Sequence, residues 1–127
     1  MTIPSDLRYT ATHQWVKTEA DGAVSVGITD HAQQQLGDVV FVQPPEIGRR
    51  VKRGENCAVV ESVKAASDIP APVSGEIVAI NSAAGDAPET LNREPYQTWL
   101  FRIRPSDVSE MAALLDAVAY AGVAEAS

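Results

Sequence analysis

The stretch that decides the fold is "CAVVESVKAASDIPAPVSGEI", residues 57–77, where two apolar runs flank Lys64, the only basic residue of the segment. Short runs rich in Val, Ile and Ala, bounded by proline and glycine, are typical of short β-strands. The segment therefore predicts a hairpin with this lysine at its tip. Small side chains follow the lysine, at Ala65, Ala66 and Ser67, and they would leave its approach open.

A single lysine in such a turn has three interpretations. It can be a surface cation that keeps an apolar hairpin soluble. It can be a Schiff-base or general-base lysine, which needs a pocket that lowers its pKa. It can also be a site of covalent attachment, where acylation removes the charge and the lysine stem becomes the root of a long arm. Attachment accounts for more of the local sequence, because a rigid, uncrowded turn suits a modifying enzyme, but the surface interpretation stays open at this point.

The chain before this hairpin also predicts strands. Between residues 8 and 29, two runs of alternating apolar and polar residues surround an Asp-Gly pair, which is typical of a β-hairpin. A capping Thr-Asp pair and a stop at Gly37 predict a short helix near 30–36. The run "VVFVQ", residues 39–43, predicts a strand that two prolines end.

The chain after the hairpin predicts a loop, a strand and a helix. Residues 81–96 show no period and are rich in Ala, Gly, Pro and Asn, which indicates a long loop. The run "TWLFRIR" alternates like a strand. From about 107 the pattern becomes helical, with a capping-box match in Asp107 and Glu110. An apolar stripe at helical spacing would face the sheet; its members are Val108, Met111, Leu114, Leu115 and Val118.

These elements predict a mainly β fold, a small barrel or sandwich with two helices added. The length of 127 residues fits one domain, residues 1–127, with a core over about 8–104 and a C-terminal helical segment over about 106–121.

Composition argues against several classes of protein. The formal net charge is −7, and the one basic cluster, "RRVKR" at 49–53, is short, so nucleic acid is not an expected partner. We read that cluster as a solvated turn. The sequence shows neither a long apolar span nor a signal peptide, so we expect a cytoplasmic protein, with no membrane partner, that is a monomer.

Catalytic motifs are also missing from the sequence. The two histidines, His13 and His31, lie far apart in the chain and predict no metal site, and Cys57 in an apolar run predicts a packed thiol. Glu61 and Asp68 could act as an acid–base pair, but such pairs occur by chance in any acidic protein. We therefore expect no catalytic residues and no metal.

The sequence resembles one known family along nearly its whole length. "ESVKAASD" at 61–68 is similar to the lipoylation motif of the glycine cleavage system H-protein family. Further segments resemble that family in the same order; they are "RYTATHQWV" at 8–16, "VGITDHAQ" at 26–33, "LGDVVFV" at 36–42, "APVSGEI" at 71–77 and "LLDAVAY" ending at 120. Biotin carriers usually have methionines on both sides of the lysine, and lipoyl domains of oxo-acid dehydrogenases usually have Asp before it. Val63 and Ala65 fit neither pattern as well.

The resemblance implies a fold and a function. The fold is the barrel-sandwich hybrid of lipoyl carriers, and Lys64 carries (R)-lipoate in amide linkage. Such a protein is a shuttle and not an enzyme. It takes an aminomethyl group from glycine decarboxylase, passes it to aminomethyltransferase, and is reoxidised by dihydrolipoamide dehydrogenase; lipoylating enzymes attach the cofactor.

The resemblance also implies roles for residues around the lysine. Residues that form the turn and guide partners would be Glu61, Ser62, Val63, Ala65 and Asp68. A cleft that protects the loaded arm would draw on Thr12, Gln14 and His31.

The sequence departs from the family pattern in two places. The family commonly has Glu where this chain has Gln14, which predicts weaker protection of the aminomethyl ammonium. The segment "NREPYQTWL" is one residue shorter and lacks a glycine before Trp99, which predicts a different loop there but leaves the lysine turn intact.

Other functions remain as alternatives. Within the carrier class, the chain could relay lipoyl groups to other enzymes or serve as an H-like carrier outside glycine catabolism. In other classes, it could be an unmodified structural or binding module, or an enzyme that uses Lys64 as a Schiff base.

Overall fold

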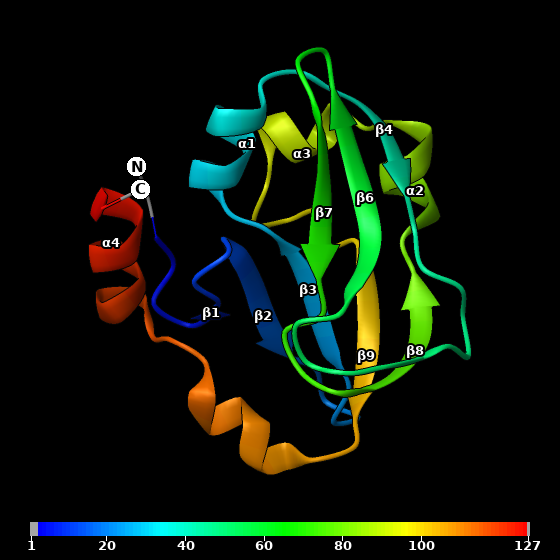
Figure 1. The fold of residues 1–127 in the computed structure, drawn as a ribbon, viewed down its shortest axis with the longest axis vertical. Helices are drawn as coiled ribbons and strands as arrows, with labels where there is room; N and C mark the ends of the chain where they lie inside the picture. Colours follow the sequence, from blue (N-terminus) through cyan, green and yellow to red (C-terminus); the bar gives the residue numbers. More distant parts are fainter. Residues whose placement is uncertain (1–2, 127) are drawn as a thin grey trace.

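A computed structural model describes residues 3–126 as a mainly β fold with two sheets (Figure 1), which confirms the predicted fold class. The larger sheet has the strand order β1-β2-β3-β9-β8-β5, and the smaller has the order β4-β6-β7. All strand pairs are antiparallel. The strands of the larger sheet are β1 (Arg8–Tyr9), β2 (Gln14–Thr18), β3 (Val24–Ile28), β5 (Arg50–Val51), β8 (Gly75–Ile80) and β9 (Phe101–Pro105). Those of the smaller are β4 (Val39–Gln43), β6 (Asn56–Ser62) and β7 (Ala66–Pro70).

The predicted N-terminal hairpin is confirmed as β2 and β3. Gln14 pairs with Ile28 at one end of the hairpin, and the turn lies at Asp21 and Gly22. Gly22 has a φ of 88°, a left-handed conformation that glycine adopts without steric cost. The Asp21 carboxylate accepts a hydrogen bond from the Ala23 N–H, which fixes the turn from its own side chain.

The predicted short helix is confirmed as α1 (Asp30–Leu36). Thr29 is the N-cap, and its hydroxyl accepts a hydrogen bond from the Ala32 N–H. Gly37 ends the helix with a φ of 77°. The sequence could predict this helix because both of its ends are determined by local residues.

The hydrophobic core draws on both sheets and is built mainly from β-branched side chains. Burying each such side chain stabilises the fold by about 1.5–3 kcal/mol. The β-branched residues of this core that are at most 2% exposed are Val16, Val24, Val26, Ile28, Val60, Ile69, Val73, Ile77 and Ile103.

Residues 81–96 are not the structureless loop that the sequence predicted. They contain two short helices, α2 (Ser82–Asp86) and α3 (Thr90–Arg93). Each is anchored by one buried apolar side chain, Ala84 in α2 and Leu91 in α3. Helices this short leave no apolar period in the sequence, so tertiary burial determines them.

The C-terminal helix is confirmed, but it is not continuous from 107. A 3-10 helix, η1 (Val108–Ala113), comes first, and α4 (Ala117–Ala126) follows. Between them Leu115 forms an antiparallel bridge with Tyr9, with a hydrogen bond of 2.8 Å in each direction. This extended bridge interrupts the helix. As a result, the predicted stripe does not face the sheet as a whole, since Val108 and Val118 are 77% and 83% exposed.

Glu110 does not close the predicted capping box. Its carboxylate accepts hydrogen bonds from the N–H and the hydroxyl of Ser74, at 2.6 and 3.1 Å. Asp107 does act as the N-cap, through the Ser109 N–H. Glu110 therefore bonds to Ser74, which is distant in sequence, and not to the backbone of Asp107 as a capping box requires.

Tyr120 fixes α4 beside β1 and α1 (Figure 1). Its ring stacks on Tyr9 with centroids 4.7 Å apart. Its hydroxyl lies 2.7 Å from the Thr29 hydroxyl and 2.8 Å from Nδ1 of His13. One buried hydroxyl thus connects the C-terminal helix to the N-cap of α1.

Removing that hydroxyl should destabilise the protein. Tyr120→Phe keeps the ring and its stacking but leaves Thr29 and His13 without this partner, so we expect the free energy of unfolding to fall by about 1–3 kcal/mol. Urea denaturation followed by circular dichroism measures the change. A free energy equal to that of the wild type would show that the hydroxyl contributes nothing.

Stability should also fall with acid because of His13. Burial, and secondarily the neighbouring His31, lower the pKa of His13 below its usual value of 6.5. The unfolded chain therefore binds a proton more readily, so stability is greatest above pH 6.5 and is lost as the pH falls through the lowered pKa. Urea denaturation between pH 7.5 and 5 should show a steeper loss for the wild type than for His13→Asn. Asn is chosen because His13 has a φ of 71°, which Asn tolerates. Parallel curves would contradict the prediction.

Candidate functional site

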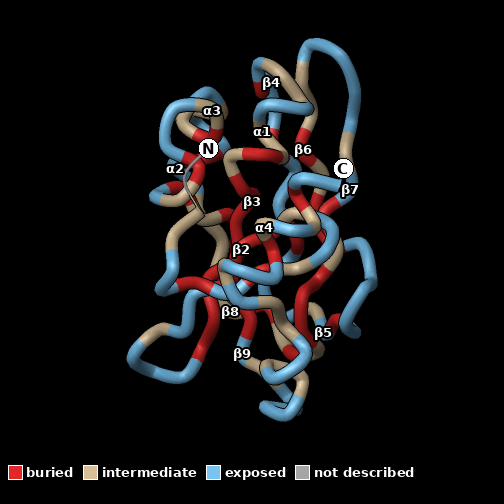
Figure 2. The backbone as a smooth tube through the Cα atoms, turned by 90° about the vertical axis from the view of Figure 1, so that its left-hand side faces the viewer, coloured by how far each residue is buried: buried red, intermediate tan, exposed pale blue. Residues whose placement is uncertain are grey.

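The hairpin of β6 and β7 places Lys64 at an exposed tip that projects from the body of the protein (Figure 2). Glu61 pairs with Ala66, and the Ser62 N–H donates to the Ala65 carbonyl at 2.8 Å. The Ser62 hydroxyl oxygen accepts hydrogen bonds from the N–H groups of Lys64 and Ala65, both at 3.1 Å. Ser62 thus holds the backbone of the lysine from within the turn.

The connection between α1 and β4 supports the lysine turn from outside. The Val63 N–H donates to the Asp38 carbonyl at 3.0 Å. The Lys64 stem lies against Gly37, where Cε would be 3.2 Å from a Cβ. A larger residue at position 37 would therefore push the lysine stem away.

Asn92 holds this connection in place, a role that no pattern in the sequence indicated. Its amide group donates to the Gly37 carbonyl at 2.8 Å and to the Gln33 side chain at 3.0 Å. Its carbonyl oxygen accepts from the Val39 N–H at 2.8 Å. Asn92 belongs to α3, in the segment predicted as a loop, so only the tertiary structure could reveal the contact.

Glu61 and Asp68 lie on the two strands that carry the turn, but not opposite each other. Glu61 pairs with Ala66, whereas Asp68 pairs with Val59. The spacing places both carboxylates on the same face of the small sheet, since residues on a strand alternate between faces. They add negative charge near the tip.

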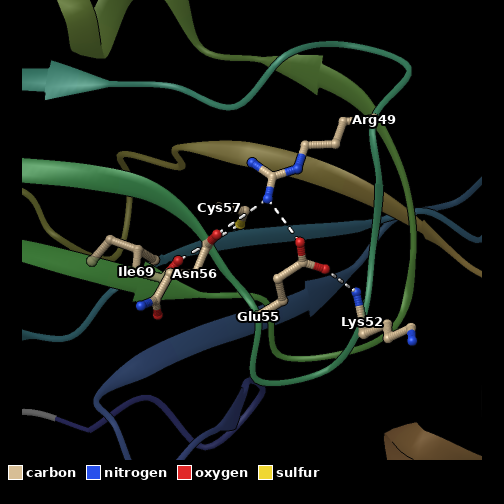
Figure 3. A network of polar contacts seen from close by, with 6 residues as sticks. All are labelled: Arg49, Lys52, Glu55, Asn56, Cys57 and Ile69. Atoms are coloured by element: carbon tan, nitrogen blue, oxygen red, sulfur yellow. Dashed lines mark hydrogen bonds and ion pairs between the residues drawn. The ribbon is translucent and has the colours of Figure 1, made fainter.

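The basic cluster at 49–53 comprises strand β5, which pairs with β8, and the start of the turn that follows it, and charged contacts stabilise this region (Figure 3). The Arg49 guanidinium donates to the Glu55 carboxylate at 2.9 Å and to the Asn56 carbonyl at 3.3 Å. The Lys52 N–H and Arg49 lower the pKa of the Glu55 carboxyl. The prediction of a solvated turn is right for the exposed side chains of Arg50, Lys52 and Arg53, but wrong for the backbone of residues 50–51, which forms a strand with Val51 buried.

Cys57 is buried behind the same turn, as predicted (Figure 3). Its thiol lies 3.6 Å from the Ile69 carbonyl. Burial raises the pKa of the thiol to about 11, so it stays protonated and unreactive near neutral pH.

A small cleft of about 150 Å³ lies beside the hairpin, between α1, β7 and the start of β2. Pockets for drug-sized ligands measure about 300–1,000 Å³, so this cleft suits only a small group. Ser67 and Ile69 of β7 line the cleft. A strand rises ~3.3 Å per residue, so both lie within about 10 Å of Ala66, where β7 leaves the lysine turn. Its lining is completed by Thr12, His13, Gln14, Ile28, Ala32, Gln35 and Leu36.

Gln14 lies at the wall of the cleft and is only 2% exposed. Its amide oxygen accepts hydrogen bonds from the hydroxyls of Thr10 and Thr12, at 2.7 and 2.6 Å. Its amide nitrogen donates to the Thr12 carbonyl at 2.6 Å. The side chain is therefore held by the segment that precedes β2.

The two histidines, which the sequence separates, lie together in the structure. Their ring centroids are 4.4 Å apart. His13 contributes to the cleft, whereas His31 stacks behind it and is buried, with Nε2 making no hydrogen bond in the described part of the chain. The pair is too small for a metal centre, and residues 3–126 hold no cluster of three potential metal ligands. The family resemblance implied His31, but not His13, as a cleft residue. The contact between the two rings arises only in the folded protein, so no local pattern in the sequence predicted it.

No helix within residues 3–126 has both the length and the apolar character needed to cross a lipid bilayer.

Comparison with known proteins gives consistent matches over almost the whole chain. The family model for the glycine cleavage H-protein matches residues 7–127. A glycine cleavage system H protein from Methylococcus capsulatus is 58% identical over 123 residues, which cover 97% of each chain. One from Halorhodospira halophila is 59% identical over 119 residues, covering 93% of this chain and 92% of the relative.

A solved structure agrees with these matches. The crystal structure of a glycine cleavage system H protein from Mycobacterium marinum superimposes with a TM-score of 0.86 and 49% sequence identity, and it covers 94% of this chain and 97% of its own. The chain therefore belongs to the glycine cleavage H-protein family, whose members are carrier components and not catalysts.

Proposed function

We propose that this protein is the lipoyl shuttle of a glycine cleavage system and that Lys64 carries (R)-lipoate in amide linkage. The observation that carries the proposal is an exposed lysine on a turn whose backbone is held by Ser62 and Asp38, with a small cleft nearby. A cofactor that moves between enzymes requires a fixed backbone at its attachment point and an exposed side chain to carry it. Membership of the H-protein family supports the same assignment.

The residues around Lys64 fit the attachment of such a group. The lysine is exposed, Ala65 and Ala66 beside it are small and exposed, and its stem lies on a glycine. When bound, lipoate would supply a disulfide able to take up an aminomethyl group; glycine decarboxylase, aminomethyltransferase and dihydrolipoamide dehydrogenase would be the enzymes that load, unload and reoxidise it. The chain itself contributes the mount, the shelter and the docking surface.

Glu61 and Asp68 contribute to docking. Both carboxylates lie on one face of the sheet beside the tip, and the whole chain has a net charge of −7. Such a surface speeds encounter with partners that present basic faces. Lipoylating enzymes and the three enzymes of the cycle would each present such a basic face. The cycle would run in the cytoplasm.

The small cleft is the proposed shelter for the loaded arm. Thr12 and Gln14 supply polar atoms at its wall, and Ile28, Leu36 and Ile69 supply apolar surface. An ammonium in this cleft would meet oxygen acceptors and be screened from water, which would slow the loss of the aminomethyl group. His31 would act on the shelter only through His13, against which it stacks.

The first test is the mass of the protein after incubation with a lipoate ligase, lipoate and MgATP. We expect a lipoyl-sized increment for the wild type and for Lys17→Ala, which removes another exposed lysine, and none for Lys64→Ala. An increment that persists in Lys64→Ala would place the cofactor elsewhere, and no increment in any variant would falsify the carrier function. Glycine–bicarbonate exchange with the decarboxylase then separates a glycine cleavage carrier from a lipoate relay.

The second test concerns Gln14, where the family commonly has Glu. In Gln14→Glu, an oxygen would replace the amide nitrogen that now donates to the Thr12 carbonyl. Two acceptors repel, so this oxygen would turn away, and the cleft would gain a charged partner for the ammonium. A charged hydrogen bond stabilises by about 1.5–3 kcal/mol, so we expect the aminomethyl group to be lost at least ~10-fold more slowly.

The loss is measured as ammonia or formaldehyde released from the loaded protein. Gln97→Glu adds the same charge at an exposed position and serves as the control, with an unchanged rate expected. Equal rates in Gln14→Glu and the wild type would rule out the proposed role of position 14.

A further inference from the structure

We propose that the enzyme that acylates Lys64 docks on an apolar platform beside the lysine turn, formed by Val40, Phe41 and Val63. The proposal rests on the proposed function, because it requires that Lys64 is modified. The matching surface of the enzyme would be an apolar recess edged by basic side chains. This surface extends beyond the lysine turn, because two of its three residues, Val40 and Phe41, belong to β4.

A β-bulge creates the platform. Val39 pairs with Ser62 and Phe41 pairs with Glu61, so Val40 is an extra residue in β4. A bulge disturbs the alternation of side chains and turns neighbouring residues to one side. Val40 and Phe41 are accordingly both exposed, at 56% and 49%, whereas Val39 and Val42 on either side of them are buried.

The platform is close to the modified lysine. Val63 directly precedes Lys64, is 68% exposed, and donates its N–H to the Asp38 carbonyl just before β4. β4 starts at the end of the molecule where the hairpin tip projects (Figure 1). An enzyme that covers the tip from this side would therefore meet all three side chains.

Protection of a sheet edge does not account for these residues. β4 is an edge strand, and a bulge there can prevent pairing with other chains. Charged or polar side chains would serve that purpose better than Val40 and Phe41. Exposed apolar side chains that gather beside a functional residue are typical of a protein interaction site.

The surrounding charge selects the kind of partner. Asp38, Glu61 and Asp68 lie around the platform, and Lys64 is the only basic residue within 37–43 and 59–68. A partner with an apolar centre and a basic rim is complementary to this pattern.

The chemistry selects the acylating enzyme among such partners. The lone pair of the neutral Nζ attacks the carbonyl carbon of lipoyl adenylate, a mixed anhydride of lipoate and AMP; the new C–N bond forms as the acyl C–O bond breaks. AMP leaves with the electron pair, and a proton passes from Nζ to a base of the enzyme or to water. This bond forms at the tip itself, whereas the enzymes of the cycle act at the far end of a long arm. The acylating enzyme is therefore the partner that must contact the tip.

The experiment measures steady-state acylation of the unmodified protein by a lipoate ligase with lipoate and MgATP. The double variant Val40→Thr/Phe41→Thr places threonine at both positions. Threonine favours strands, so β4 should be retained, but it offers less apolar contact area than Val or Phe. We expect KM for the protein substrate to rise about 10-fold with kcat unchanged, as when central contacts of an interface are truncated. Phe41→Thr alone should give a smaller rise in KM.

Ile47→Thr is the matched control, because Ile47 is 62% exposed and lies after β4, away from the bulge. It should leave KM unchanged, and urea denaturation should show that every variant is folded. A KM for the double variant equal to that of the wild type overturns the platform while acylation at Lys64 still stands. A wild type that is never acylated overturns the proposed function instead, and the platform with it. A wild-type dimer that the double variant loses would assign the surface to a second copy of the chain and also overturn the proposal.

Discussion

The site depends on the hydrogen bond between the Val63 N–H and the Asp38 carbonyl, 3.0 Å long. Apart from this bond, the backbone of the turn is supported by the pairing of β6 with β7 and, on one side only, with β4. This bond ties the turn to the segment between α1 and β4, which Asn92 holds through the Gly37 carbonyl. The backbone of the lysine is thus fixed to the body of the protein, while its side chain is exposed.

Helix α1 links this mount to the rest of the fold. Its C-terminal Gly37 lies under the lysine stem, and its N-cap Thr29 bonds to Tyr120 of the C-terminal helix. Ala32 and Leu36, between these ends, line the cleft. A helix of only seven residues is marginal on its own, so contacts at both of its ends determine where the cleft and the lysine lie.

The sequence predicted the features that local residues determine. The hairpin at Gly22, the caps of α1 and the lysine turn each depend on neighbours within a few positions, so residue type and spacing sufficed. Asn92, the contact of His13 with His31, and the bonds of Tyr120 join segments far apart in the chain, and no local pattern marks them. The C-terminal helix shows the limit most clearly. Its apolar spacing predicted one continuous helix, but the bridge between Leu115 and Tyr9 competes with helical hydrogen bonds and divides it.

The cleft and the platform lie on opposite faces of the small sheet, and this separation follows from the alternation of a strand. On β7, Ser67 and Ile69 face the cleft, so Ala66 and Asp68 face the other side. Glu61 pairs with Ala66 and with Phe41, which places the outer face of β6 and the bulged part of β4 on the side of the platform. If Lys64 is modified as proposed, the acylating enzyme would therefore dock on one face and the arm would reach the cleft on the other. Attachment of the cofactor and shelter of its cargo need not compete for the same surface.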